Sequence, residues 1–324
     1  MRYIQLVMAV AAGVLASSEI SFAQGVTEYP GKPVRIIAAA GVGGGADVIG
    51  RIFAQKLSEN LKNQFVVENR PGGGDTIGIG LVAKSAPDGY TLMVATPSLT
   101  ISPALYPNFT VDPIRDFVPI SLTNKAPYLL VVHPSLPVKS VRDLIVLAKD
   151  KPGSMNIGIT VGGTQHLATA YLISLANIKI TTVPYTQAGQ IMTDTMGGQI
   201  HGYVLPVQTT LPVLRSGRVR ALGVTTAERT PILPELPTIS ESGVPGYDVS
   251  GWYGWIAPSG TPAAIVSKLN AELVRALRSP DVAKRMADDG AVVVGNTPEQ
   301  FGQLIAAEIP RWRKVVKDLG IRVE

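Results

Sequence analysis

The chain has 324 residues, 46% of them hydrophobic and 16% charged, which agrees with a compact protein long enough for two α/β domains with separate cores. It contains no cysteine, which excludes a disulfide framework, thiolate chemistry and a zinc–thiolate site. The net charge of +5 could suggest a nucleic-acid partner. The basic residues are scattered, however, and the densest group, at positions 311–317, shares its helix with acids, so we expect a solvated face and no nucleic-acid binding.

Residues 1–23 have the pattern of a cleavable export signal. Arg2 gives a weakly charged start, the run from Leu6 to Leu15 is mostly apolar, and Ser21-Phe22-Ala23 fits the small-x-small pattern of a cleavage site. The alternative, a membrane anchor, is disfavoured because the run is shorter than the roughly 20 residues that span a bilayer. We expect cleavage after Ala23. An exported chain without cysteine is typical of the bacterial periplasm, where we expect this protein.

The first third of the chain alternates strands and helices. Val34 to Ala40 is a continuous apolar run, as in a strand buried on both faces, and a helical stripe follows from Asp47 to Leu61. The alternation continues with a strand at Phe65–Glu68, a helix at Ile77–Ser85 and a strand at Thr91–Thr96. This β-α-β-α-β order predicts the first half of a doubly wound parallel sheet.

A second cycle of strands and helices begins near Tyr128. We expect strands at Leu129–His133, Asn156–Thr160, Thr182–Tyr185, Gly202–Leu205 and Ala221–Thr225, and helices at Val141–Lys149 and Gln165–Ala176. A proline-rich segment, Arg229–Tyr247, is expected to be a long connection.

The C-terminal part is predicted to be helical. Three hydroxyl–proline pairs mark helix starts, because each places a capping side chain before a proline: Thr261-Pro262, Ser279-Pro280 and Thr297-Pro298. Thr297 and Gln300 have the spacing of a capping box. Pro310 should kink the last helix or end its first half near Ile309.

Two glycine-rich loops carry the functional signal. Gly41–Ala46 and Val161–Thr164 each follow a strand and open a helix, in different halves of the chain. A helix N-terminus presents unpaired backbone N–H groups and the positive end of the helix dipole, and both favour an anion. We expect the two loops to face each other across a cleft and to hold an anionic ligand. The alternative for either loop is a tight turn that uses the permissive φ of glycine.

The first loop also satisfies the G-x-G-x-x-A form of the dinucleotide fingerprint, with Glu68 about 20 residues further on, so an exported oxidoreductase is an alternative. Two features disfavour it: Asp47 would place a carboxylate beside a pyrophosphate, and an exported chain would have to find its dinucleotide outside the cytoplasm. The histidines His133, His166 and His201 are far apart, and there is no G-x-S-x-G motif. We expect no enzyme, no cofactor and no metal site.

An aromatic cluster and one histidine allow two interpretations each. Trp252, Tyr253 and Trp255 are expected to pack in the core and hinge, with cleft lining as the alternative. His166 lies in the first turn of its helix, where we expect a polar contact or cap, with ligand contact as the alternative.

Short motifs occur in a characteristic order along nearly the whole chain. They include YPGKPVRII, GGGAD, VVENRPGGG, APDGYTL, ISPALYP, DPIRDFVPISL, VVHPSLPVKSVRDL, GGTQHLA, LPVLRSGRVRALGVTT and TPEQF. With these motifs the chain, from about Tyr29 to Ile321, resembles the substrate-binding proteins of tripartite tricarboxylate transporters, the Bug family.

This resemblance implies a two-lobed type II periplasmic binding protein, an α/β fold in which each lobe is a sheet flanked by helices and two crossing strands join the lobes. Lobe 1 would hold residues 24–124 plus 254–324, and lobe 2 residues 125–253. Such a protein captures a small organic carboxylate and delivers it to membrane permease subunits. We expect this chain to be a monomer. A protein that presents its ligand to a membrane sensor would use the same site, so that alternative stays open.

The resemblance also implies which residues contact the ligand. They are Ala40, Gly43, Gly44, Gly45, Ala46, Asp47 and Ser98 on one side, and Gly163, Thr164 and Gln165 on the other. Asp47 corresponds to the usual acid of the family, which would anchor an amine or hydroxyl of the ligand or else cap its helix.

Several positions depart from the family pattern. Ala39 and Ala40 stand where a proline and a bulky aromatic residue are usual, and Val204 and Leu205 stand where phenylalanine and aspartate are frequent. These residues are smaller or less polar, which suggests a roomier and more apolar pocket. We therefore expect an aromatic or longer-chain carboxylate as the ligand, rather than one like citrate.

Overall fold

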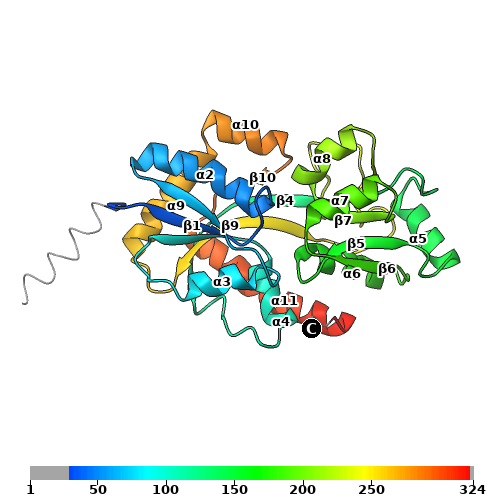
Figure 1. The fold of residues 1–324 in the computed structure, drawn as a ribbon, viewed down its shortest axis with the longest axis horizontal. Helices are drawn as coiled ribbons and strands as arrows, with labels where there is room; N and C mark the ends of the chain where they lie inside the picture. Colours follow the sequence, from blue (N-terminus) through cyan, green and yellow to red (C-terminus); the bar gives the residue numbers. More distant parts are fainter. Residues whose placement is uncertain (1–28, 322–324) are drawn as a thin grey trace, which may run out of the picture.

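The computed structural model describes residues 29–321, so the expected export signal and its cleavage site lie outside the described residues. Within them the strands form one ten-stranded sheet that runs through two lobes, seen side by side in Figure 1. The strand order is β2-β1-β3-β9-β4-β7-β5-β6, and β8 and β10 also pair with β4. Helices flank the sheet in both lobes, as expected for an α/β binding protein.

The first lobe contains the predicted parallel β-α-β-α-β unit. Its strands are β1 (Val34–Ala38), β2 (Phe65–Asn69) and β3 (Thr91–Ala95), and β1 pairs in parallel with both others. Its helices are α2 (Gly45–Leu61), α3 (Thr76–Ala83), α4 (Ser98–Leu105), α9 (Ala263–Leu277), α10 (Pro280–Asp288) and α11 (Pro298–Leu319), and β10 is Val292–Val293. Helices α2, α9 and α10 pack on one face of the sheet, and α3, α4 and α11 on the other.

The second lobe repeats the parallel arrangement. Strand β5 (Asn156–Thr160) pairs in parallel with β6 (Thr181–Tyr185) and β7 (Gly202–Pro206), and β8 (Arg220–Val224) pairs with β4. The helices are α5 (Val141–Asp150), α6 (Thr164–Leu175), α7 (Ala188–Met196) and α8 (Val207–Arg215). The predicted proline-rich connection after β8 contains no helix and a single isolated bridge.

Two long strands connect the lobes. Strand β4 (Phe117–Val132) and strand β9 (Ser250–Pro258) are antiparallel, from Phe117 opposite Pro258 to Pro127 opposite Ser250. In the first lobe β9 also pairs with β3, and beyond Pro127 β4 pairs with β7 and β8 of the second lobe. These are the two crossing strands that the resemblance implied. The expected lobe boundaries, near 124 and 254, fall within them and stay a prediction.

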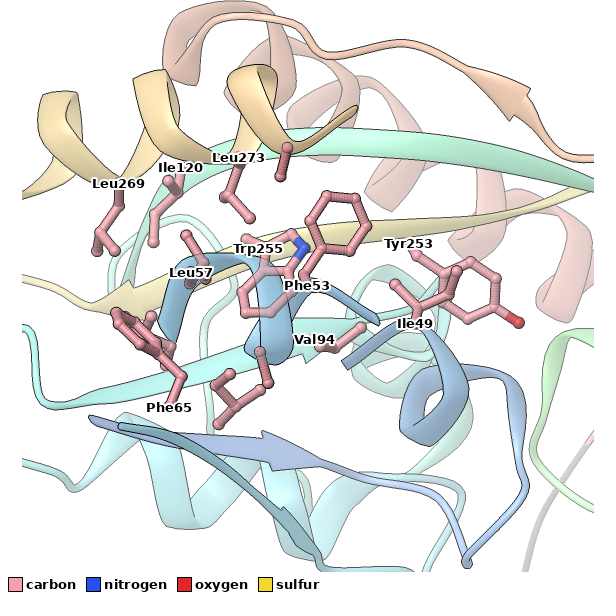
Figure 2. Close-up of a cluster of buried hydrophobic side chains, with 14 of the residues drawn as sticks. Ile49, Phe53, Leu57, Phe65, Val94, Ile120, Tyr253, Trp255, Leu269 and Leu273 are labelled. Atoms are coloured by element: carbon pink, nitrogen blue, oxygen red, sulfur yellow. The ribbon is translucent and has the colours of Figure 1, made fainter. Parts of the chain in front are cut away.

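The core of the first lobe forms around Trp255 on β9. Figure 2 shows Phe53 and Leu57 of α2 close to this tryptophan and Ile49 beside Tyr253, with Leu269 and Leu273 on α9 above. The rings of Phe53 and Trp255 meet edge to face with their centroids 5.7 Å apart. Trp255 is fully buried, as is Trp252 on the opposite face of β9, where it packs against Phe301. Core packing, predicted for both tryptophans, is confirmed.

Helix α11 belongs to both cores. Phe301, Ile305 and Ile309 pack in a first-lobe cluster, whereas Trp312 and Val316, further along the same helix, pack in a second-lobe cluster. The helix continues through Pro310 to Leu319, so the expected end of its first half near Ile309 is wrong. Two strands and one long helix therefore link the lobes mechanically.

Several element boundaries differ from the sequence prediction. Strand β1 ends at Ala38, and α2 begins at Gly45 instead of Asp47 because Gly44 is in the extended N-cap conformation. Helix α9 begins at Ala263, and Thr261 donates its hydroxyl hydrogen to the carbonyl of Pro258 at 2.8 Å instead of capping the helix. The capping box that opens α11 is present as predicted. Helices α4, α7 and α8 were not predicted.

Candidate ligand-binding site between the two lobes

The first glycine loop ends at Gly44, and α2 begins directly after it. Gly43 has a φ of +79°, a conformation that favours glycine, and Gly44 at the N-cap offers the helix no capping side chain. The backbone N–H groups of Gly45 and Ala46 find no hydrogen-bond acceptor among the residues that the structure describes. Unpaired donors of this kind are what a helix N-terminus offers to an anion.

The carboxylate of Asp47 is bound by its own loop and by neighbouring side chains. It accepts hydrogen bonds from Gly43 N (2.9 Å) and Asn69 Nδ2 (3.0 Å) and pairs with Arg51 Nε at 2.9 Å. Burial raises the pKa of this carboxyl, but the hydrogen bonds outweigh burial and hold the pKa below its ordinary value. Asn69 also donates to the carbonyl of Ala40, which ties that residue to the same network. This geometry favours the capping alternative for Asp47.

The second glycine loop repeats the geometry of the first. Gly162 has a φ of +79°, Gly163 is the N-cap of α6 without a capping side chain, and the N–H groups of Thr164 and Gln165 have no acceptor within the described part of the chain. The N–H of Gly162 donates to Nδ1 of His166 at 3.4 Å. Burial lowers the pKa of His166, so its ring stays neutral and can accept this bond. His166 thus makes the expected polar contact.

Two tyrosines of the crossing strands lie against the two helix starts. The hydroxyl of Tyr253, on β9, is so close to Gly45 that a Cβ atom built on the glycine would lie 1.8 Å from it. Tyr128, on β4, lies close enough to Thr164, at the start of α6, for this side chain to lower the pKa of its hydroxyl, although burial outweighs that effect. Burial raises the pKa of both hydroxyls, so both are protonated at neutral pH. The crossing strands therefore place one phenol beside each glycine loop.

A third glycine loop, Gly72–Gly74, brings the lobes into contact. A Cβ atom on Gly74 would lie 2.3 Å from the Tyr106 hydroxyl and 3.3 Å from the carbonyl oxygen of Gly162. A Cβ atom on Gly162 would lie 1.9 Å from the same hydroxyl. The third loop is therefore in contact with the second glycine loop, and the ring of Tyr106 lies beside both loops.

Asp75 follows the third loop directly and is the N-cap of α3. Its Oδ2 accepts a hydrogen bond from Thr96 Oγ1 at 2.9 Å, and the backbone N–H of Ser98 donates to the same Thr96 Oγ1 at 3.3 Å. Burial raises the pKa of Asp75. Its charge in turn raises the pKa of Tyr106, Tyr128 and Tyr253, so Asp75 lies within electrostatic reach of all three. Ser98, a predicted site residue, is buried at the start of α4, beside Thr96.

Sequence reasoning missed Asp75, Tyr106 and Tyr128. Asp75 comes directly after three glycines, before a helix, and this strand–loop–helix order could have marked it. Tyr106 and Tyr128 carry no local signal, since their role depends on a convergence of both lobes. Tyr253 was noted with cleft lining as the alternative to core packing, and its position at Gly45 fits that alternative.

Other features of the described residues offer no competing site. A hollow of about 580 Å³ lies on the second lobe, lined by the end of α8, the start of β8 and residues 232–236. Its lining is largely apolar and includes no residue of the glycine loops. Residues 29–321 hold no cluster of three or more histidine and acidic side chains suited to a metal ion. No helix in this part of the chain is long and apolar enough to cross a membrane.

Comparisons with known proteins agree with this architecture. Residues 49–321 match the tripartite tricarboxylate transporter family receptor. Protein BugT of Bordetella pertussis is 34% identical over 313 residues, which cover 96% of each chain.

Two solved structures resemble the chain closely. One is R. palustris Rpa4515 with adipate. Its sequence is 36% identical to this chain, and the match has a TM-score of 0.86 and covers 91% of this chain and 99% of that one. The other is MatC from Rhodopseudomonas palustris with bound malate, 32% identical, with a TM-score of 0.83 over 89% of this chain and all of that one. The predicted two-lobed periplasmic binding fold is confirmed.

Proposed function

The chain belongs to the tripartite tricarboxylate transporter receptor family, and we propose that it captures a small organic carboxylate between its lobes and delivers it to the membrane permease subunits of such a transporter. It is a solute-binding protein, like its family. We further propose that it works as a monomer in the periplasm, after export and cleavage behind Ala23.

The observation that carries this proposal is the set of unpaired backbone donors at two helix starts. Gly45 and Ala46 open α2, Thr164 and Gln165 open α6, and none of the four N–H groups has an acceptor among the described residues. A hydrogen bond to a charged group contributes about 1.5–3 kcal/mol, and the helix dipole adds about 0.3–1 kcal/mol for an anion at its N-terminus. A carboxylate, with two oxygens, suits such paired donors.

The class of carboxylate follows from two sources. Adipate and malate are bound by the two relatives described above, and both are dicarboxylates. The resemblance marks four positions with smaller or less polar residues than usual; Ala40 is partly buried beside the first glycine loop, whereas Ala39, Val204 and Leu205 are buried in hydrophobic clusters. We propose a ligand on the longer side of this range, with an aliphatic or aromatic body between its polar ends.

Capture would work by closure of the lobes. The donors on α2 come from the proposed lobe 1 (residues 24–124 plus 254–324), and those on α6 from lobe 2 (residues 125–253). A ligand that contacts both sets only in the closed state shifts the hinge equilibrium by the difference between its affinities for the two states. The closed, loaded protein would then dock on the permease.

A thermal-shift screen of the mature chain tests this function. The panel holds dicarboxylates, tricarboxylates, aromatic acids, amino acids and NAD. A ligand present at 100 times its dissociation constant stabilises the fold by about 2.7 kcal/mol, which a thermal shift readily detects. Stabilisation by one group of carboxylates supports the proposal, whereas stabilisation by NAD alone contradicts it.

A pair of variants at Thr164 tests the backbone donors. Thr164 is the first helical residue after the extended Gly163, so proline fits there and removes only an N–H that the helix does not use. Thr164→Ala removes the hydroxyl but keeps the N–H. The proline variant should bind the ligand roughly 10-fold or more weakly than the alanine variant. Equal affinities of two folded variants would contradict the role of this loop.

A further inference from the structure

The hollow on the second lobe has the size of a small-molecule site. Its volume is about 580 Å³, and its walls come from four places in the sequence: Pro134 after β4, the end of α8 at Leu214, residues 219–221 at the start of β8, and residues 232–236. Sites for small molecules usually hold about 300–1,000 Å³. No residue of the glycine loops lines the hollow, so the capture of a carboxylate between the lobes leaves it without a role.

The walls of the hollow are mostly aliphatic. Leu214, Ile232, Leu233 and Leu236 all line it, and each keeps part of its surface accessible to water. The same four residues pack against the hydrophobic cluster of the second lobe that contains Leu205, which holds their side chains in place. An apolar occupant would remove the remaining exposed surface of these side chains from water, which favours binding.

Arg220 supplies a charged group in this apolar wall. It is half-buried, and its Nη1 donates hydrogen bonds to the carbonyls of Val138 at 2.8 Å and Leu136 at 3.4 Å. These bonds hold the guanidinium in place, and no hydrogen bond joins its Nε or Nη2 to another of the described residues. Because an arginine can bind a carboxylate through two parallel N–H groups, Nε and Nη2 together suit such a ligand.

The charges at the hollow are mostly positive. Arg215 and Arg218 are exposed and stand next to lining residues in the chain, and Glu235 is the acid among the lining residues. None of the ion pairs within residues 29–321 involves these three side chains or Arg220. Three arginines against one glutamate leave an excess of positive charge, which favours an anion. The dipole of α8 accounts for Arg215, in the last turn of that helix, but for neither Arg218 nor Arg220.

We infer that the hollow is a second binding site, which takes an organic anion with an apolar body, such as a medium-chain carboxylate. The chain of such a ligand would lie against Leu214, Ile232 and Leu236, and its carboxylate would meet Arg220. A neutral apolar molecule would leave the N–H groups of Arg220 without an acceptor, and a small polar anion would leave the aliphatic walls in water. The second site adds to the proposed function and does not depend on it.

Three probes test the chemistry of the site on the mature wild-type protein. Titration calorimetry at about pH 7 compares octanoate with octanamide, which lacks the charge, and with acetate, which lacks the chain. Octanoate should bind about 10-fold or more tightly than either, since only octanoate satisfies both Arg220 and the aliphatic walls. Equal binding of octanoate and either other probe, or no binding of octanoate, would overturn the second site.

Two variants locate the bound octanoate. Ala221→Leu places a larger side chain in the wall of the hollow, and Arg220→Gln removes the charge while keeping an amide donor for a carbonyl. Each should weaken the binding of octanoate about 10-fold or more. Arg278→Gln is the matched control, because Arg278 is an exposed arginine at the end of α9, outside the hollow, and this variant should bind octanoate like the wild type.

Thr164→Pro separates the hollow from the cleft. It acts on the start of α6 and should leave the binding of octanoate in the hollow unchanged. Loss of octanoate binding in Thr164→Pro, with full binding in folded Ala221→Leu, would place octanoate in the cleft; this result overturns the second site and leaves the proposed function standing. If Arg220→Gln does not fold, Ala221→Leu decides, and an unchanged octanoate affinity in that variant contradicts the second site.

Discussion

Gly45 and Tyr253 are packed so closely that a Cβ atom on the glycine would lie 2.7 Å from a ring carbon of the tyrosine as well as on top of its hydroxyl. The first turn of α2 thus rests directly on the crossing strand β9. Any side chain at position 45 must push apart two elements that hold the donors of Gly45 and Ala46 in place.

Gly45→Ala should destabilise the fold by about 1–3 kcal/mol through overpacking and should weaken ligand binding together with it. Urea unfolding and titration calorimetry measure the two effects. Gly80→Ala is the matched control, because Gly80 lies in α3 with no atom within 4 Å of its added Cβ. That control should be neutral or stabilising by about 0.5–1 kcal/mol, since alanine favours a helix interior. Similar losses in both variants would refute the contact argument.

Asp47→Ala should cost about 1–3 kcal/mol of stability at pH 7, because it leaves the N–H of Gly43 without its acceptor and removes one of the two acceptors of the Asn69 amide. The folded-state pKa of Asp47 is lowered, so its contribution is complete above the unfolded pKa, near 3.9, and is lost as the pH falls through the lower folded value. Unfolding curves of wild type and variant should therefore converge in strong acid. A difference that stays constant from pH 7 to pH 2 or so would contradict this account.

Glu308→Gln should change the pH dependence of stability in the sense opposite to that of Asp47→Ala. Glu308, buried on α11, accepts hydrogen bonds from Thr100 Oγ1 at 2.8 Å and Trp252 Nε1 at 3.1 Å, and burial raises its pKa. Its contribution is therefore complete below the unfolded pKa and declines as the pH rises through the raised folded value.

Glutamine resembles the neutral acid, since its amide can donate to Thr100 while its oxygen accepts from Trp252. The variant should lack the decline in stability with rising pH that Glu308 causes in the wild type. Chemical denaturation from pH 4 to pH 9 or so measures this difference. Parallel stability profiles for the two proteins would show that Glu308 does not titrate in this way.

Thr297→Ala should cost about 1 kcal/mol by removing the capping box of α11, in which Thr297 Oγ1 accepts from Gln300 N at 3.3 Å and Gln300 accepts from Thr297 N at 3.1 Å. Ser279→Ala at the start of α10 is the comparison, because Ser279 stands at an N-cap without a side-chain capping bond. The loss at Ser279 should be smaller. Equilibrium unfolding of the two variants measures how much each hydroxyl contributes to the free energy of unfolding.

The sequence predicted best those features that rest on neighbouring residues. The capping box needs only Thr297 and Gln300, and the parallel unit of the first lobe needs only apolar runs separated by glycine loops. Helices α4 and α8 escaped prediction because Pro103 and Pro212 lie within them, together with several β-branched residues of low helix propensity. In these helices tertiary packing overrides the local preference.

The site could be predicted only in part for a related reason. The glycine loops are visible in the sequence because their donors belong to a single strand–loop–helix segment. Asp75, Tyr128 and Tyr253 lie far apart along the chain, and their juxtaposition depends on how β4 and β9 cross. No local pattern encodes the distance between such groups.

Helix α11 is weakest where it passes from one core to the other. Ile309 packs in the first lobe and Trp312 in the second, and Pro310 between them has no N–H for the carbonyl of Ala306. We expect the missing hydrogen bond to make this turn the most easily bent part of the helix, so that closure of the lobes would bend α11 there and the ligand would decide the balance between open and closed states.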